Sequence, residues 1–264
     1  MTTQTIHYWH SPLLPGVELC RSHHTNFSYG RHVHLDYHIG LVQQGCQQFI
    51  HKGNRHQLVA GRLSTVNPDE VHDGLSLLPE GYQVRVFSLP PAALARWLPE
   101  GRERFFHAPL QQSQSLYAGF ARLHTYLESP HAEALQAEGW LMSLLAELFC
   151  LPAAGTALAD PQLRCLRDYL LAHLDQRHTL ADLAGLLGLE RFVFLRQFKQ
   201  RTGMTPYAWL KRLRLEWAKG QLGLGRPLAE VALAAGFFDQ SHFHHGFRQA
   251  YGLTPAGYRQ QIRA

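Results

Sequence analysis

The last third of the chain repeats one pattern of apolar and polar positions. Residues 178–210 and residues 228–258 each carry a run of apolar side chains at helical spacing, then a glycine, then a second apolar run at the same spacing. Both copies close on Gly-x-Thr-Pro, where glycine suits the end of one helix and Thr-Pro suits the start of the next. The pattern predicts two helix-turn-helix units, with the second helix of the first unit at about residues 190–202.

A plain helical bundle shows the same apolar stripe, so one copy of the pattern would not distinguish a bundle from a helix-turn-helix unit. Two copies with the same glycine and Thr-Pro positions favour the helix-turn-helix interpretation. In that arrangement the second helix of each unit lies in the major groove of DNA. The sequence therefore predicts that the C-terminal part of the chain binds double-stranded DNA.

Residues 17–90 show a different pattern, in which the apolar segments are short and turn signals separate them. Such a pattern is typical of a strand-rich sandwich or barrel, and strands and helices do not alternate here. We expect turns at four places, which are Gln44-Gly45, Lys52-Gly53-Asn54, Ala60-Gly61 and Asn67-Pro68-Asp69.

Between residues 116 and 149 the apolar positions return to helical spacing, interrupted at Ser129-Pro130. Two helices are predicted, with an apolar stripe that packs against the strand-rich part or against a second copy of the chain. Small, proline-bounded residues then indicate a linker at 152–161. The predicted fold class is therefore α+β with two domains, a strand-rich domain with its helical segment at residues 1–151 and an all-α domain at residues 162–264.

Charge is unevenly distributed between these parts. Residues 162–264 carry 15 Lys and Arg against 7 Asp and Glu, a net charge of +8, whereas residues 1–161 carry 10 against 13, a net charge of −3. A basic surface attracts DNA phosphates whatever their sequence. The charge thus agrees with DNA binding by the helical domain.

The side chains expected to meet DNA lie on the second helix of each unit. Arg196 can pair with guanine through two hydrogen bonds, whereas its basic neighbours suit phosphates. Asp239 is expected to cap the helix of the second unit, which leaves the polar residues after it facing outward. The predicted DNA-binding residues are Arg191, Phe192, Leu195, Arg196, Lys199, Arg201, Gln240, Ser241, His242, His245 and Arg248.

The segment VALAAGFFDQSHFHHGFRQAYGLTPAGYR closely resembles the C-terminal motif of the AraC/XylS family of bacterial transcription regulators, and the resemblance extends over roughly residues 162–264. It implies base recognition at six positions. Two positions depart from the family pattern, because Glu190 stands where Ser is usual at the helix cap and His245 stands where Arg is frequent. A histidine contact is weaker and depends on pH, so we expect looser recognition by the second unit. The six implied positions are Phe192, Leu195, Arg196, Gln240, Ser241 and His245.

The stretch HVHLDYHIGLVQQGCQQFIHKGNRHQLVAGRLSTVNPDEVHDG resembles the cupin-like effector domain that precedes the DNA-binding domain in many such regulators. This resemblance implies a small barrel, which can hold one ligand in its mouth. Four residues at even spacing would share one face of a strand, with His72 on a later strand beside them. The predicted effector pocket is His32, His34, Asp36, His38 and His72.

The histidines of this pocket leave three interpretations open. Imidazoles at this spacing bind zinc, nickel or iron in metal-dependent cupins, although His38 stands where those proteins carry an acidic residue. A metal-free pocket for an organic effector is the favoured alternative, and histidines that only hydrogen-bond within the barrel are the third. No cofactor is predicted, and the candidate metal ligands are His32, His34, His38 and His72.

Other classes of function find little support in the sequence. No Ser/His/Asp set, phosphate loop or pair of acids indicates catalysis, and four scattered cysteines show no CxxC spacing. No apolar run suits a signal peptide or a membrane span, so we expect a cytoplasmic protein. The overall prediction is an effector-responsive transcription activator, not an enzyme, that forms a homodimer and contacts DNA and RNA polymerase. The competing function is a metal-dependent cupin enzyme or metal sensor that carries a DNA-binding domain.

Overall fold

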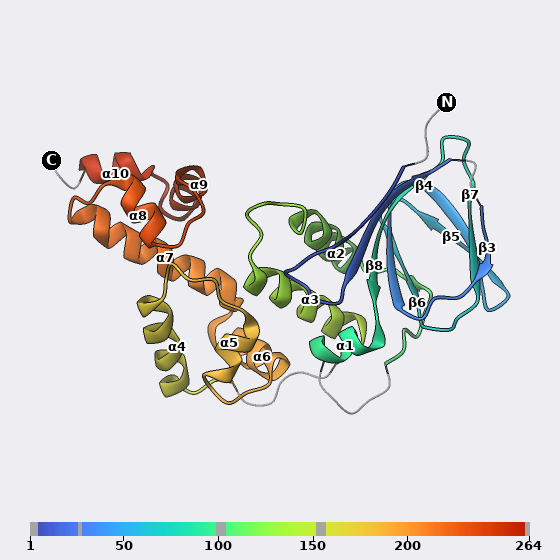
Figure 1. Cartoon of the computed structure of the whole chain (residues 1–264), viewed down its shortest axis with the longest axis horizontal. Helices are drawn as coiled ribbons and strands as arrows, with labels where there is room; N and C mark the ends of the chain where they lie inside the picture. Colours follow the sequence, from blue (N-terminus) through green and yellow to red (C-terminus); the bar gives the residue numbers. More distant parts are fainter. Residues whose placement is uncertain (1–4, 26–27, 99–103, 152–156, 262–264) are drawn as a thin grey trace. The chain divides into compact units, whose positions relative to one another are not determined.

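The computed structural model describes residues 5–25, 28–98, 104–151 and 157–261 (Figure 1). The chain forms two compact units, of which the first comprises Met1–Ala132 and Trp140–Pro152. The second comprises Glu133–Gly139 and Ala153–Ala264. A short segment from the middle of the chain therefore groups with the C-terminal helices, which the predicted domain ranges did not anticipate. Half of the predicted linker, residues 152–156, lies outside the described residues.

The first unit is rich in antiparallel strands, as the short apolar segments predicted. Its sheet runs in the order β1-β2-β8-β4-β6-β9, while β5 and β7 pair with another part of β4, and β3 pairs with β7. Within the described residues the strands are β1 (Thr5–His10), β2 (Glu18–His24), β3 (Ser28–His32), β4 (Tyr37–His51), β5 (Asn54–Val59), β6 (Arg62–Val66), β7 (His72–Ser76), β8 (Tyr82–Leu89) and β9 (Leu110–Gln111).

Strand β4 shapes this sheet because it takes part in both of its halves. Its first residues pair with β6 and β8 and its last residues pair with β5 and β7, so the sheet curls around it (Figure 1). The turn predicted at Gln44-Gly45 is wrong, since β4 continues through these residues with an irregular register against β8. Gly45 has φ +76°, and a Cβ there would lie 2.2 Å from the Gly81 carbonyl oxygen, so glycine permits a kink in place of a turn.

Helices α1 (Pro91–Trp97), α2 (Gln114–Tyr126) and α3 (Ala134–Leu148) follow the strands, and the predicted break at Ser129-Pro130 is confirmed. The apolar stripe of α2 packs against the sheet. Phe120 is fully buried with its ring 5.4 Å from that of Phe87, and the Tyr117 hydroxyl donates to the Val42 carbonyl at 3.1 Å. For α2, the structure thus supports packing on the sheet, the first of the two roles expected of the stripe.

A buried polar group ties α2 to the sheet at His124, which is fully buried. Arg85 Nη1 donates to His124 Nδ1 at 2.8 Å, and His124 Nε2 donates to the Cys20 carbonyl at 3.1 Å. Glu128 accepts a hydrogen bond from the same Arg85 guanidinium. Burial, followed by the charge of Arg85, lowers the pKa of His124 to about 4.

This arrangement predicts a loss of stability on acidification. Between pH 6.5 and about pH 4, His124 binds a proton in the unfolded protein but stays neutral in the folded protein. The free energy of unfolding therefore decreases as the pH falls through this range. The neutral His124 contributes at most about 3 kcal/mol to the free energy of unfolding, and this contribution is fully present above pH 6.5. Urea denaturation as a function of pH measures it, with His124→Gln as the comparison. Equal pH dependence of wild type and variant would contradict this assignment.

The described residues of the second unit form helices joined by short turns and loops. Its capping residues are those that the repeated pattern predicted, since Gly188 and Gly236 adopt positive φ in the turns and Thr205 caps the helix that follows it. No helix in the described part of the chain is long and apolar enough to span a bilayer. The helices are α4 (Asp160–Ala172), α5 (Leu180–Gly185), α6 (Arg191–Thr202), α7 (Pro206–Gly223), α8 (Leu228–Ala234), α9 (Gln240–Tyr251) and α10 (Pro255–Gln261).

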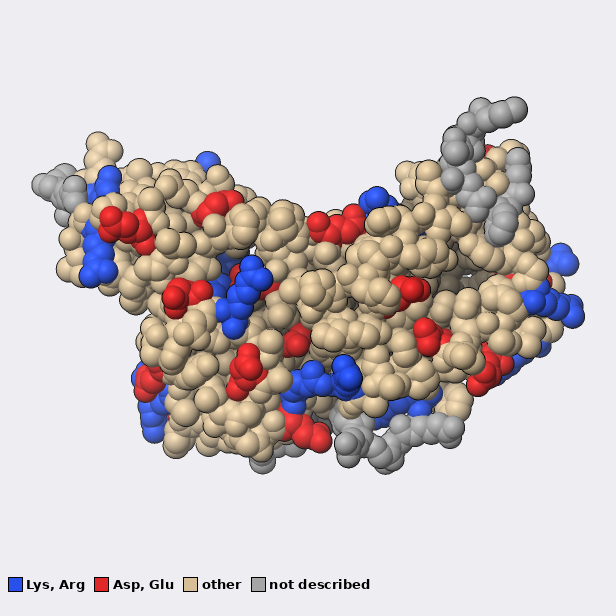
Figure 2. Space-filling view, viewed as in Figure 1, with Lys and Arg blue, Asp and Glu red and all other residues tan. Residues whose placement is uncertain are grey.

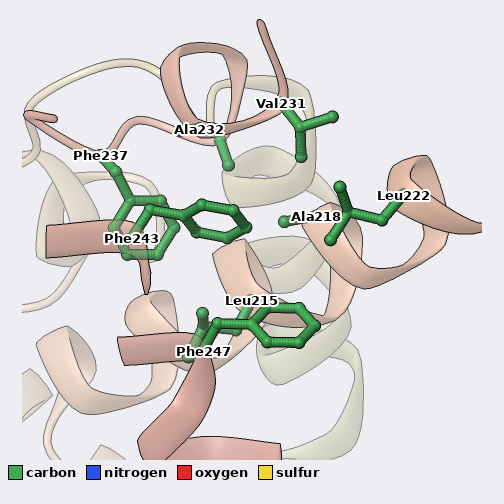
Figure 3. Close-up of a cluster of buried hydrophobic side chains, with 9 residues drawn as sticks. Leu215, Ala218, Leu222, Val231, Ala232, Phe237, Phe243 and Phe247 are labelled. Atoms are coloured by element: carbon green, nitrogen blue, oxygen red, sulfur yellow. The ribbon is translucent and has the colours of Figure 1, made fainter. Parts of the chain in front are cut away.

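Each helix-turn-helix unit has its own core, and α7 connects the two. The second core is shown in Figure 3, where side chains of α7, α8 and α9 converge with Phe237. Phe243 and Phe247 of α9 are 1% and 0% exposed, so the face of α9 opposite to them is the one left for solvent. The two predicted helix-turn-helix units are confirmed, with α6 and α9 as their second helices.

A buried arginine in α7 connects distant parts of this unit. Arg214 is 3% exposed, and its Nε and Nη2 atoms donate to the carbonyls of Leu174 and Gln176, each at 3.0 Å. Its Nη1 atom donates to both carboxylate oxygens of Glu133, at 3.2 and 3.0 Å. One side chain thus fixes two distant chain segments, the loop at residues 174–176 and the segment of Glu133, to the middle of α7.

Candidate functional site

A cavity of about 680 Å³ lies inside the sheet of the first unit. Seven of the strands contribute to its wall, so it corresponds to the interior of a small barrel. Its volume suits a small organic molecule. All residues of the predicted effector pocket lie in the wall, namely His32, His34, Asp36, His38 and His72. Their expected proximity is confirmed, whereas the ligand stays a prediction.

The even-numbered residues between 32 and 38 do not share one strand face, so that expectation is wrong. Strand β3 ends at His32, residues 33–36 form a bend, and β4 begins at Tyr37. The Asp69 N–H donates to the His34 carbonyl at 2.8 Å, which fixes the bend against the turn before β7. The bend, and not strand alternation, places His34 beside the histidines of β3 and β7.

Three imidazoles meet on one side of the cavity. The Nε2 atoms of His32 and His34 are 3.1 Å apart. One ring nitrogen from each of His32, His34 and His72 lies within 4.8 Å of the others, a spacing that would allow all three to hold one metal ion. His38 is outside this trio and stacks on His34, with ring centroids 3.7 Å apart.

Burial holds several of these rings in the neutral state. Desolvation by burial, with repulsion by the neighbouring imidazoles, lowers the pKa of His34 to about 4 and that of His38 to about 3. Burial also lowers the pKa of His72. A neutral imidazole has one donor and one acceptor nitrogen and can give its lone pair to a metal ion. The cluster can therefore hydrogen-bond a polar effector or coordinate a transition metal.

The charged side chains of the wall are acidic. Glu18, Asp36 and Asp73 line the cavity, and no Lys or Arg belongs to its described lining. An anionic effector would consequently find no permanently cationic side chain in the wall. The electrostatics favour a neutral or cationic ligand.

Two walls of the cavity were not predicted from the sequence. They come from strands β2 and β8, in which every second residue faces the interior. The missed signal was this alternation, which is weak because polar and apolar side chains both line the cavity, so the inward positions are not uniformly apolar. The residues concerned are Glu18, Cys20, Ser22 and His24 of β2, and Tyr82, Val84, Val86 and Ser88 of β8.

The basic residues of α6 reach the surface of the second unit. Lys199 and Arg201 are exposed, and Arg201 pairs with Asp160. Arg191 and Arg196 are half-buried, and the Arg196 guanidinium lies 5.1 Å from the centroid of a neighbouring Phe ring. In Figure 2, Lys and Arg side chains are visible over the C-terminal helices among acidic ones.

Two apolar residues of α6 lie in the core and not on the surface. Phe192 and Leu195 are 7% and 1% exposed, and a Cβ on Gly139 would lie 4.0 Å from the Leu195 side chain. Their spacing of three residues continues the stripe of Phe194 and Phe198, which explains why they are buried. The burial of these two side chains contradicts their predicted exposure to DNA bases.

In the second unit, α9 presents Gln240, Ser241, His245 and Arg248 to solvent. The expected cap is present, because the Asp239 carboxylate accepts from the His242 N–H at 2.6 Å. His242 itself is half-buried and packs edge-on against Phe237, with centroids 5.5 Å apart, so it does not face outward as expected.

Comparisons with known proteins agree with both units. A family model described as the AraC-like ligand binding domain matches residues 14–145, and a helix-turn-helix domain model matches residues 183–261. The transcriptional activator RhaS of Pectobacterium atrosepticum is 27% identical over 253 residues, which cover 89% of this chain and 88% of that protein. The transcriptional regulator YbfI of Bacillus subtilis is 26% identical over 220 residues, 80% of each chain. The MmsAB operon regulatory protein of Pseudomonas aeruginosa is 33% identical over 155 residues, 56% of this chain and 49% of that protein.

Proposed function

The chain belongs to the AraC/XylS family of DNA-binding transcription regulators, and from this premise we propose that a ligand in the cavity of the first unit controls how the two helix-turn-helix units bind DNA. One observation carries the proposal, which is that a single chain joins a histidine-lined cavity of about 680 Å³ to a pair of helix-turn-helix units. Binding energy in the cavity can alter DNA affinity only if the ligand prefers one state of the chain.

We propose activation as the mode of regulation because the RhaS relatives are named as activators. Homodimerisation and contact with RNA polymerase belong to the same proposal, since paired DNA half-sites are commonly bound by dimers. A purely regulatory role without turnover is proposed over the cupin enzyme, because the relatives are named as regulators.

Selection of bound duplexes from a random DNA library by the full chain tests the DNA-binding role. We expect enrichment of two short motifs separated by about one helical turn, and an affinity that decreases with salt concentration. Metabolites that change the affinity for the selected DNA then identify the effector. Recovery of random sequence with no enriched motif would contradict sequence-specific regulation.

The two units should differ in their contribution to this DNA affinity. On the selected DNA at pH 8, we expect Arg196→Ala to cost about 1–3 kcal/mol, because it removes a charged side chain able to bond guanine. His245→Ala should cost less, since an imidazole makes a weaker contact than a guanidinium does. Fluorescence anisotropy measures both affinities, with exposed Arg226→Ala, outside both second helices, as the control. The idea of looser recognition by the second unit fails if His245→Ala costs as much as Arg196→Ala.

A further inference from the structure

We infer that the cavity holds a divalent transition-metal ion on the Nε2 atoms of His32, His34 and His72. The inference rests on the proposed function, because it names the chemistry of the ligand that the same cavity would take. Three observations of the first unit carry it. They are the spacing of the three rings, the fixed orientation of two of them, and the charge of the surrounding wall.

The spacing of the nitrogens is close to that of a metal site. Zinc binds imidazole nitrogen at about 2.0–2.1 Å in tetrahedral geometry, which places neighbouring ligand nitrogens about 3.3 Å apart. His32 Nε2 and His34 Nε2 are 3.1 Å apart, and the ligand atoms of the trio lie within 4.8 Å of one another.

Backbone carbonyls fix the rings of His32 and His72. His32 Nδ1 donates to the Gly30 carbonyl at 2.7 Å, and His72 Nδ1 donates to the Glu70 carbonyl at 2.9 Å. A donor at Nδ1 leaves Nε2 of each neutral ring with a lone pair directed away from the carbonyl. Metal-binding histidines in proteins are oriented by this kind of bond.

Residue Glu70 is itself held in place. Its carboxylate accepts from His51 Nε2 at 2.8 Å and from Lys52 Nζ at 2.6 Å. The segment that orients His72 is therefore restrained by side chains at the end of β4 and in the turn after it. Such a restrained support is what a metal ligand needs to keep its geometry.

Hydrogen bonds among the three histidines cannot give every Nε2 atom a partner. Nε2 of His32 and Nε2 of His72 are both acceptors, and the single proton that His34 can place on its Nε2 serves only one of them. A cation gives all three lone pairs a partner at once. The acidic wall, with Glu18, Asp36 and Asp73 and without Lys or Arg in the described lining, adds an attraction for positive charge.

Three imidazoles leave one position of a tetrahedral ion open. That position would face the cavity, where an effector carrying an anionic oxygen, such as a carboxylate, can occupy it. The ion would then supply the positive charge that the wall lacks. The effector class becomes a small oxygen-donor ligand that binds only to the metal-loaded chain.

Cobalt titration of the full chain tests the site directly. After removal of metals with a chelator, Co²⁺ should give the visible absorption of a tetrahedral ion at one equivalent, and Zn²⁺ should displace it. His32→Gln, His34→Gln and His72→Gln should each weaken Co²⁺ binding at least about 100-fold, because even loss of an orienting partner costs 10- to 100-fold. In the control, His23→Asn removes the preceding histidine of β2, which is outside the described cavity lining and whose Nε2 donates to the Glu80 carbonyl at 3.1 Å, and binding should change less than about twofold.

Weaker Co²⁺ binding could also result from a variant that fails to fold, so a second variant is needed that gains a spectroscopic signal. His34→Cys should add a sulfur-to-cobalt charge-transfer band in the near ultraviolet, which only a thiolate bound to the ion produces. Absence of stoichiometric Co²⁺ binding by the wild type, or equal affinity in the trio variants, overturns the metal site. Either result leaves the DNA selection experiment unaffected, so failure of the metal site and failure of the regulatory function are told apart.

Discussion

Replacing Arg214 with Met should lower the free energy of unfolding of the second unit by about 3–5 kcal/mol, the usual cost of breaking a buried ion pair. The side chain is 3% exposed, and Met fills much of its volume without any donor. The carbonyls of Leu174 and Gln176 would lose the guanidinium donor, and the carboxylate of Glu133 would lose its ion pair while keeping the hydrogen bond from the Tyr207 hydroxyl. A buried acceptor that loses its donor bears the full desolvation cost.

Urea denaturation measures this effect, with amide hydrogen exchange to assign the loss to residues 157–261. The matched control is Arg212→Met, two residues earlier in α7. Its side chain is 44% exposed and pairs with Glu216 one turn later, so removal should cost less than about 0.5 kcal/mol. Similar destabilisation by the two substitutions would show that Arg214 acts only as a surface charge.

The second large effect is expected at the turn of the second helix-turn-helix unit, where Gly236→Ala should cost about 3 kcal/mol or more. Gly236 has φ +75°, which costs an L-residue about 1–2 kcal/mol. A Cβ there would also lie 2.1 Å from the Leu174 carbonyl oxygen and 3.0 Å from Arg214 Nε. Because the nearest atom is backbone, relief of the clash requires the loop or the turn to move.

The first unit offers an equivalent turn as the control. Gly188 has φ +64°, and nothing lies within 4 Å of the position that a Cβ would take there. Gly188→Ala therefore carries the conformational cost alone, about 1–2 kcal/mol. Thermal or urea unfolding of both variants gives the difference, and equal losses would mean that the contact with Leu174 does not constrain the turn. In an Arg214→Met background the cost of Gly236→Ala should decrease, since the two residues share the Leu174 carbonyl.

The sequence was sufficient to predict the parts that depend on neighbours along the chain. Thr205, Gly203 and Asp239 act on helix ends a few residues away, so both helix-turn-helix units and their boundaries could be derived from them. The histidine cluster was predicted as a set because the resemblance to a cupin-like domain placed His72 beside the earlier histidines, whereas the bend at residues 33–36 was not predicted.

The contacts of Arg214 could not be predicted in this way. Its partners Leu174, Gln176 and Glu133 are 40, 38 and 81 positions away along the sequence, and helical periodicity carries no information at such separations. An arginine in an amphipathic helix is more commonly exposed. The burial of Phe192 and Leu195 was missed because the resemblance specified their position in the helix but not their packing.

The grouping of residues 133–139 with the C-terminal helices limits how the regulator can be cut and recombined. Within the second unit, Glu138 accepts from the Leu180 N–H at 2.6 Å, in addition to the pairing of Glu133 with Arg214. A chimaera joined at the linker would take residues 133–139 from the other protein. The Leu180 N–H and Arg214 would then face a foreign segment in place of Glu138 and Glu133. Exchange of ligand domains between relatives therefore has to conserve Glu133 and Glu138, or their equivalents, as part of the DNA-binding module.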